Sequence, residues 1–301
     1  MPSIKELKKR IVTVKNTQQT TKAMKMVSAA KLRRAQDAIT AHRPYAKKLG
    51  ELIRLVSSMS ATQYSSPLIG GTNTAKGGKV LLVLVTSDRG LCGAFNGNVF
   101  KRAQAWVNQN KANYQAIDLA FVGRKSFEFF KNRGLTKADT FYEEFGRKAT
   151  FESAKKTANW AIAQFEAGKY DRVYFIYNEF KNAISQVIVV ENFLPIQPET
   201  AQVEDSKSSK ADAKVDLFLV KPSTKEVLDR LLAKHFAVQA YRILLESQAS
   251  EHGARMSAME NATKNAGDMM KELTLSYNKQ RQAGITKELL EIISGSESQK
   301  G

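Results

Sequence analysis

The stretch TSDRGLCGAFNGN (86–98) lies between a predicted buried strand and a predicted helix, which is where many proteins place a loop that binds phosphate or a dinucleotide. Such a loop needs glycines spaced as G-x-G-x-x-G, or a Gly-Lys-Ser/Thr sequence. Gly90, Gly93 and Gly97 fit neither pattern. The next predicted strand, IDLAFVG (117–123), does not end in an acid that could bind a ribose. The stretch is therefore interpreted as a tight strand-to-helix turn rather than a nucleotide site.

Nucleophilic chemistry or metal binding would need cysteine or histidine close to other catalytic or metal-binding side chains. The chain has one cysteine and three histidines. Cys92 cannot form an intramolecular disulfide, and it has no histidine near it in the sequence, so it is interpreted as an inert core or turn residue. His42, His235 and His252 lie in long predicted helices without metal-ligand spacing. Neither a catalytic site, a metal nor a cofactor is predicted. His42 and His235 fall on positions where a polar residue often fixes the register of a coiled coil.

The net charge of +18 is concentrated near the amino terminus, because residues 1–59 contain 14 Lys and Arg against 3 Asp and Glu. Such a block predicts an acidic partner, which could be nucleic acid, an anionic membrane surface or a carboxylate-rich protein. The stretch KAMKMVSAAKLRRAQ (22–36) sets methionine and alanine beside the basic residues, and no aromatic residue for base stacking occurs between Met1 and His42. These features favour a face that slides along another protein. A basic coiled-coil protein that binds nucleic acid is the alternative.

The sequence also bears on the compartment. No stretch reaches the ~18 consecutive apolar residues of a membrane span, and the amino terminus lacks the apolar core of a signal peptide. With a single cysteine, a soluble chain in a reduced, cytoplasmic setting is expected, which can still belong to a membrane-bound assembly.

The elements that position these residues begin with two long helices. Glycine and proline are absent from Ser3 to Arg43, and no proline follows Pro222. In the first region, apolar positions alternate in steps of three and four, as in the seam of a coiled coil. These positions are Leu32, Ala35, Ile39, His42, Ala46, Leu49, Ile53 and Val56. Helices of this length need a partner for their apolar faces, so the two are predicted to pair as an antiparallel coiled coil.

Between the helices, buried-strand runs alternate with helical periodicity, which is typical of an α/β domain. Strands are predicted at 78–87, 117–123, 170–180 and 185–196, the last two as a hairpin, and helices at 96–109, 125–134 and 150–168. The predicted fold class is α/β with a long coiled coil, the middle domain being Rossmann-like. The predicted divisions are an N-terminal helix (1–60), a linker (61–78), the α/β domain (79–198), a second linker (199–222) and a C-terminal helix (223–296).

Three stretches resemble the gamma subunits of F-type ATP synthases in order and spacing. They are KRIVTVKNTQQTTKAMKMVSAAKLRRAQ (9–36), TSDRGLCGAFN (86–96) and ASEHGARMSAMENATKNAGDMMKELTLSYNKQRQAGITKELLEIISG (249–295). The resemblance implies a non-catalytic central rotor stalk, which couples proton-driven rotation to the conformational cycle of catalytic sites that make ATP from ADP and phosphate. It implies three alpha and three beta subunits around the shaft, with an epsilon subunit and a membrane c-ring at its foot. It implies no cofactor, no nucleic acid, and membrane association only through the complex, at the cytoplasmic face of a bacterial inner membrane.

By the same resemblance, the basic stretch of the first helix and parts of the last helix contact carboxylate-rich loops of the catalytic subunits. The implied contact residues are Met24, Lys25, Lys31, Arg33, Arg34, Arg255, Arg281, Gln282 and Thr286. The chain departs from the family pattern at Ala94, where a second glycine is usual, and at Lys221, where an acidic residue is common. The contacts around Lys221 therefore stay open. The cysteine pair that chloroplast relatives use as a thiol switch is absent, since Cys92 is alone.

Overall fold

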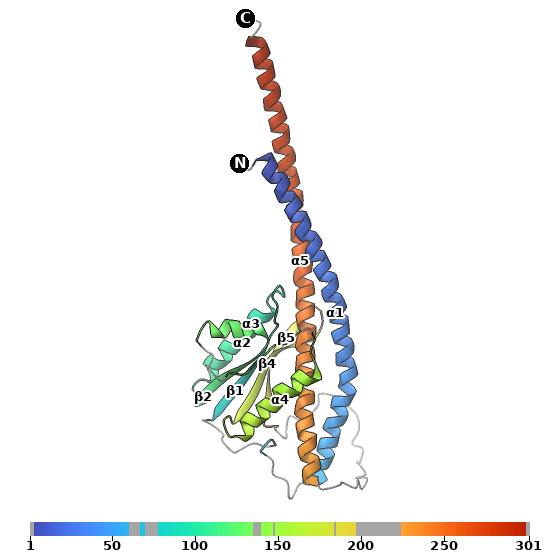
Figure 1. Cartoon of the computed structure of the whole chain (residues 1–301), viewed down its shortest axis with the longest axis vertical. Coiled ribbons are helices and arrows are strands. Elements are labelled where there is room, and N and C mark those ends of the chain that lie inside the picture. The colour runs from blue at the N-terminus through green and yellow to red at the C-terminus, as the bar shows by residue number, and fades with distance from the viewer. Residues whose placement is uncertain are drawn as a thin grey trace. The chain divides into compact units, whose positions relative to one another are not determined.

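The fold is described from a computed structural model of the chain (Figure 1). The residues described are 3–59, 67–69, 78–134, 140–146, 148–183, 185–196 and 224–298. The predicted linker 199–222, including Lys221, and most of the predicted linker 61–78 lie outside them. The chain divides into two compact units, the terminal unit (Met1–Ala30 with Arg255–Gly301) and the central unit (Lys31–Ala254). The five divisions expected from the sequence stay predictions.

Two long helices each contribute to both units. They are α1 (Ile4–Met59) and α5 (Thr224–Ser298), so the two long helices expected from the glycine and proline distribution are confirmed. A capping box starts α1: the Ser3 amide donates to Glu6 Oε2 (3.1 Å), and the Glu6 amide donates to Ser3 Oγ (3.3 Å). The helix continues through Pro44, although proline removes one backbone donor there.

The α/β domain lies within the central unit. Its strands are β1 (Lys79–Val85), β2 (Ala116–Val122), β3 (Tyr142–Glu143), β4 (Arg172–Phe180) and β5 (Gln186–Leu194). Among the described residues the strand order is β3-β2-β1-β4-β5, with every neighbouring pair parallel except β4 and β5. The predicted hairpin and the four predicted strands are confirmed. The short strand β3 has no counterpart in the sequence prediction, because two residues are too few to show a period.

Helices cover both faces of this sheet. On one face, apolar residues of the strands pack against α2 (Phe95–Asn110) and α3 (Arg124–Lys131). On the other face, the ring of Phe193 on β5 lies 4.6 Å from that of Phe175 and 5.3 Å from that of Phe236 on α5. The helix α4 (Phe151–Glu166) packs against β4. Burial on both faces explains the unbroken apolar run KVLLVLV of β1.

A half-buried charged cluster also joins α5 to the sheet. Arg242 on α5 forms an ion pair with Glu191 on β5 and donates to the hydroxyl of Tyr177 on β4 (3.2 Å). The Tyr177 hydroxyl donates in turn to Glu191 Oε2 (2.6 Å). Because each member of the cluster has a partner, the cost of removing these charges from water is offset. The cluster fixes the orientation of α5 on the sheet.

The connection from β2 to α3 depends on a glycine. Gly123 has φ of +102°, and its amide donates to the Glu143 carbonyl (2.9 Å). A Cβ atom at this position would lie 2.0 Å from the Thr86 carbonyl oxygen. Any side chain would therefore displace backbone at the end of β1 as well as strain its own backbone.

We predict that Gly123→Ala lowers the free energy of unfolding by about 2 kcal/mol or more, because it combines a forbidden φ with a backbone clash. Gly134→Ala is the matched control. Gly134 also has positive φ (+66°) but has nothing within 4 Å of the added atom, so it should cost only about 1 kcal/mol. Urea unfolding of the full-length variants measures both, and equal losses would contradict the role assigned to Gly123.

His235 on α5 is a half-buried titratable group in the same unit. Its Nδ1 is inaccessible and has no hydrogen-bond partner among the described residues. Burial, together with the nearby Arg242 charge, lowers the pKa of His235 to about 4. The folded state therefore prefers the neutral ring, while the unfolded chain protonates near the ordinary pKa of 6.5.

We expect His235 to make the protein less stable as the pH falls from about 6.5 to 4, because the unfolded state binds the proton first. The loss would reach at most about 3 kcal/mol. The difference in unfolding free energy between wild type and His235→Gln isolates this contribution from that of the carboxylates. Parallel pH profiles of the two proteins would refute the expectation.

Candidate partner-contact surface

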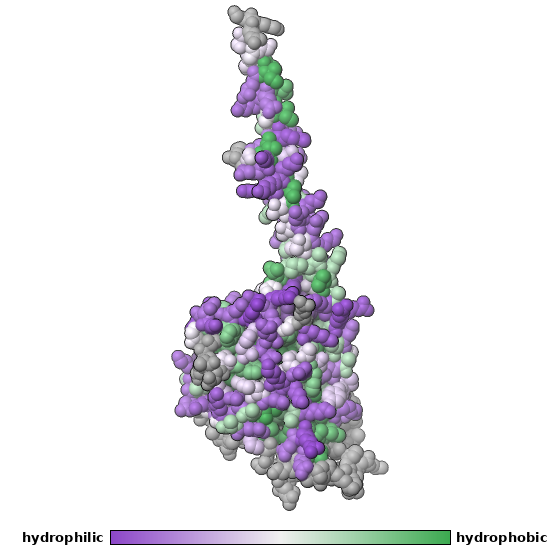
Figure 2. Space-filling view, in the orientation of Figure 1, coloured by the Kyte–Doolittle hydropathy of each residue, from purple (hydrophilic) through white to green (hydrophobic). Residues whose placement is uncertain are grey.

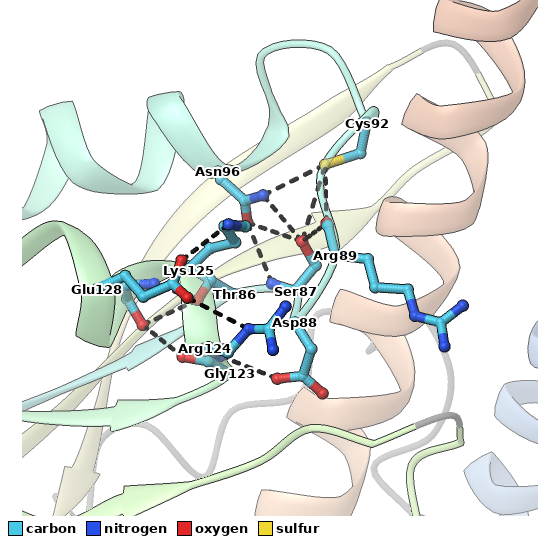
Figure 3. A network of polar contacts seen from close by, with 11 residues as sticks. Thr86, Ser87, Asp88, Arg89, Cys92, Asn96, Gly123, Arg124, Lys125 and Glu128 are labelled. Carbon is cyan, nitrogen blue, oxygen red and sulfur yellow. Dashed lines mark hydrogen bonds and ion pairs between the residues drawn. The ribbon is translucent and has the colours of Figure 1, made fainter.

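The strand-to-helix turn after β1 is closed by its own side chains (Figure 3). Asn96 Oδ1 accepts from the Ser87 amide (3.1 Å), and Asn96 Nδ2 donates to Ser87 Oγ (2.8 Å) and to Cys92 Sγ (3.3 Å). The Ser87 hydroxyl donates to the Arg89 carbonyl (2.6 Å). In a nucleotide-binding loop the Ser87 amide would face a phosphate. Here this amide already donates its hydrogen bond to Asn96. This geometry agrees with the predicted tight turn.

Asp88 ties the same turn to its neighbours. Its Oδ1 accepts from the amide of Arg124 at the start of α3 (2.8 Å), and its Oδ2 accepts from the amide of Gly146 (2.6 Å). Cys92, which belongs to this turn, is buried, with 2% of its surface exposed. The residues of this turn therefore serve the local structure. Within the described ranges, no group of three or more side chains could hold a metal ion.

In the terminal unit, α1 and α5 pair in antiparallel fashion. The hydroxyl oxygens of Thr21 and Thr263 lie 2.8 Å apart, and one turn further along α1 the Lys25 ammonium lies 2.5 Å from Glu260 Oε1. Because the residue number rises on α1 as it falls on α5, the predicted antiparallel coiled coil is confirmed.

Small residues allow α1 and α5 to approach each other closely in this pair. A Cβ atom at Gly267 would lie 3.0 Å from Nε2 of Gln18, and one at Gly284 would lie 3.7 Å from Cδ1 of Ile4. The absence of large seam residues between Gln18 and Lys31 in the sequence therefore reflects close contact through small and polar side chains. Sequence reasoning missed the partners Glu260 and Gly267, although together with Thr263 they follow the step of three and four.

The carboxyl-terminal candidates lie where the pair ends. Gly284 is opposite Ile4, the first residue of α1, so the α5 residues from 285 to 298 have no α1 residue beside them in the described chain. Arg281, Gln282 and Thr286 are exposed there, within two turns of one helix. The Thr286 hydroxyl donates to the Gln282 backbone carbonyl (3.0 Å), while the side chains of Arg281 and Gln282 are exposed to solvent.

The same end of α5 exposes large apolar side chains. In Figure 2, hydrophobic and hydrophilic residues alternate along the terminal unit. The apolar residues of this segment are between 51% and 68% exposed: Ile285, Leu289, Leu290, Ile292 and Ile293. A cluster of this kind on a helix without a partner indicates a surface that contacts another protein.

The candidates on α1 fall into two groups. Lys31, Arg33 and Arg34 are exposed in the central unit, because Leu32 and Ala35 take the buried seam positions beside them. Met24 and Lys25 are half-buried in the terminal unit. The charge of Lys25 is already paired with Glu260.

Arg255, the remaining candidate, is half-buried on α5 and interacts within the chain. The structure thus brings Arg281, Gln282 and Thr286 together and places the other six candidates on separate stretches of the two helices.

Comparison with known proteins identifies the family. The family model described as ATP synthase matches residues 3–298. The ATP synthase gamma chain of Geobacter metallireducens is 49% identical over 302 residues, and that of Bdellovibrio bacteriovorus is 46% identical over 301 residues. Both alignments cover 100% of this chain and 100% of the relative. The chain belongs to the ATP synthase gamma chain family.

Solved structures agree with this membership. The chain is similar to one in the central stalk and c-ring of the Tetrahymena thermophila mitochondrial ATP synthase, with 28% identity and a TM-score of 0.58. That alignment covers 81% of this chain and 99% of the Tetrahymena chain. A chain of the Euglena gracilis mitochondrial ATP synthase has the same fold, with 20% identity, a TM-score of 0.63, and coverage of 98% of this chain and 94% of that chain.

As a gamma chain, the protein is a subunit of an F-type ATP synthase and part of its central stalk. The comparisons do not support the alternative of a nucleic-acid-binding coiled coil. Among the described helices of this gamma chain, none is long and apolar enough to cross a membrane.

We predict that the ion pair between Lys25 and Glu260 contributes little to the stability of this gamma chain, although it joins the two helices. Its side chains are 38% and 57% exposed, and exposed pairs typically contribute about 0.2–1 kcal/mol. A double-mutant cycle of Lys25→Met and Glu260→Gln in the full-length chain measures the coupling. The coupling should shrink in 1 M salt, where the Debye length is about 3 Å. A salt-independent coupling above about 2 kcal/mol would contradict this reading.

Proposed function

We propose that this gamma chain is the rotating shaft of its ATP synthase and does no chemistry itself. The observation that carries the proposal is the end of α5, where an exposed apolar helix continues past the start of α1. A surface of this kind suits a helix that is surrounded by other subunits in the assembly. The polar residues that could have formed a nucleotide site at the end of β1 are instead used to close a turn.

The mechanism is mechanical coupling. One asymmetric shaft cannot present the same face to three identical catalytic sites at once, so each shaft orientation stabilises a different set of site conformations. Proton flow would turn a ring bound to the foot of the shaft, and the paired helices would carry the torque to the catalytic sites. A two-helix coil suits this role because its paired seam resists twisting better than a single helix.

The proposed partners are three alpha and three beta subunits around the shaft, and an epsilon subunit and the c-ring at its foot. The similar Tetrahymena chain belongs to a structure of a central stalk with a c-ring, which supports the last of these. The proposed location is the cytoplasmic face of a bacterial inner membrane, reached only through the complex. The similar Geobacter and Bdellovibrio gamma chains are bacterial, in keeping with that location.

The nine candidate residues are proposed as contacts between the shaft and the catalytic subunits. The exposed guanidinium groups of Arg33, Arg34 and Arg281 can bind carboxylates in bidentate fashion, and Gln282 adds donors that carry no charge. Such contacts would form in some shaft orientations and break in others. The remaining residues of the set are Met24, Lys25, Lys31, Arg255 and Thr286.

The proposal predicts that Arg281→Ala, Gln282→Ala slows turnover of the assembled complex about tenfold or more. Each charge-assisted hydrogen bond contributes roughly 1–3 kcal/mol, and about 1.4 kcal/mol corresponds to tenfold in rate. Assembly should survive, because both side chains are exposed and do not support the coil. ATP hydrolysis, proton pumping and ATP synthesis are measured together on complexes reconstituted in sealed vesicles.

Asp268→Ala, Lys271→Ala is the matched control, since both side chains are exposed on α5 and pair only locally (3.5 Å). This variant should keep rates within about twofold of wild type. Normal rates of all three activities in the Arg281, Gln282 variant would show that these residues are solvated surface. Failure of that variant to assemble would show a structural role instead.

A further inference from the structure

A cavity of about 100 Å³ lies between α1 and α5 within the central unit. Ile39, His42 and Ala46 of α1 and Arg242 and Glu246 of α5 contribute to its wall. A water molecule needs about 10–15 Å³ of such space. The cavity is therefore large enough for several water molecules or for a larger apolar side chain.

Two acceptor atoms of residues in this wall have no protein partner. His42 Nε2 and Glu246 Oε2 are both inaccessible, and neither has a hydrogen-bond partner among the described residues. The other Glu246 oxygen lies 3.5 Å from Arg242 Nη1. Leaving two buried acceptors without donors would be costly, and their occurrence on residues that share one cavity points to a donor within it.

The charges around the cavity limit what that donor can be. Arg242 and Arg43 add positive charge to its wall, while Glu179 and Glu191 act on Glu246 from the sheet side. The described residues offer no group of three potential metal ligands anywhere. A small neutral molecule with two donor hydrogens fits this mixed environment, and water is the smallest such molecule.

We propose that the cavity is a hydrated site in which ordered water bridges His42 Nε2 and Glu246 Oε2, so that the two side chains hold one proton between them and link α1 to α5. When the proton lies on Glu246 Oε2, the carboxyl O–H donates to the water and the water donates to Nε2 of the neutral imidazole. When it lies on His42 Nε2, the N–H donates to the water and the water donates to the ionised carboxylate. The proton passes from one to the other through the water by breaking an O–H bond and forming an N–H bond.

The electrostatics agree with this sharing. Burial lowers the pKa of His42, with the Arg242 charge acting in the same direction. Burial raises the pKa of Glu246, with Arg242 opposing it. Each group is therefore shifted toward its neutral form, in which a carboxyl O–H can donate and an imidazole Nε2 can accept.

Filling the cavity distinguishes a hydrated site from an empty one. Ala46→Leu should lower the thermal midpoint of the full-length chain by about 2–4 °C or more, because it displaces water that the two acceptors need. The matched background is the double variant His42→Leu, Glu246→Leu, in which the wall has no unpaired acceptor. There the same Ala46→Leu change should raise the midpoint, as filling an apolar cavity does. A change of the same sign in both backgrounds would overturn the proposal.

Nuclear magnetic resonance tests the shared proton independently. Since the chain has only three histidines, labelling the full-length protein with ¹⁵N-histidine gives three pairs of ring-nitrogen signals, and His42→Gln assigns one pair by its loss. In Glu246→Gln, the titration midpoint of His42 should fall by about one pH unit or more, because its partner carboxylate is gone. The midpoint of His235 is the internal reference and should not move. An unchanged His42 midpoint would show that the two groups do not share a proton.

Discussion

Most of the stability of a helix in a protein comes from packing of its apolar face, so the antiparallel pairing of the two helices of 56 and 75 residues is the interaction on which the rest of the structure depends. The two units achieve this pairing differently. In the terminal unit the helices approach closely through Thr21, Thr263 and Gly267, where little apolar area can be buried. In the central unit larger seam residues such as Leu32 and Ile39 are buried, and the sheet supplies a further apolar surface for α5.

The central unit therefore surrounds α5 in a way that the terminal unit does not. From Ile243 to Gly253 almost every residue of α5 is buried, including polar ones. Such burial is tolerable only where partners exist, as for Ser250, whose hydroxyl donates to the Asn178 carbonyl (3.0 Å). The Arg242 cluster follows the same rule with charged groups. Partners drawn from β4 and β5 hold this stretch of helix against the sheet at a defined rotation about its own axis.

Much of this architecture could be predicted, because the spacing of apolar residues and the local composition indicate which side chains are buried. The absence of glycine and proline from Ser3 to Arg43 and of proline after Pro222 predicted the long helices, and the apolar runs predicted four strands and the hairpin. What could not be predicted is which residues meet. Periodicity places Lys25 and Glu260 on the facing sides of two helices, but it does not set the register that joins them. Likewise Arg242 and Glu191 look like ordinary surface charges in the sequence, and only the packing of α5 on β5 makes them a pair.

The candidate contact residues were inferred by resemblance, and the structure adds a physical distinction among them. Side chains that serve the fold have their donors and acceptors committed inside the chain, as Lys25 does with Glu260 and Arg242 does with Glu191. Arg281 and Gln282 are exposed beside an apolar helix end. On the proposed function, a rotating surface must form and release contacts repeatedly, so it cannot use groups that the fold already holds. The exposed residues at the end of α5 meet that requirement better than the half-buried Lys25, whose ammonium would first have to leave an acid of its own chain.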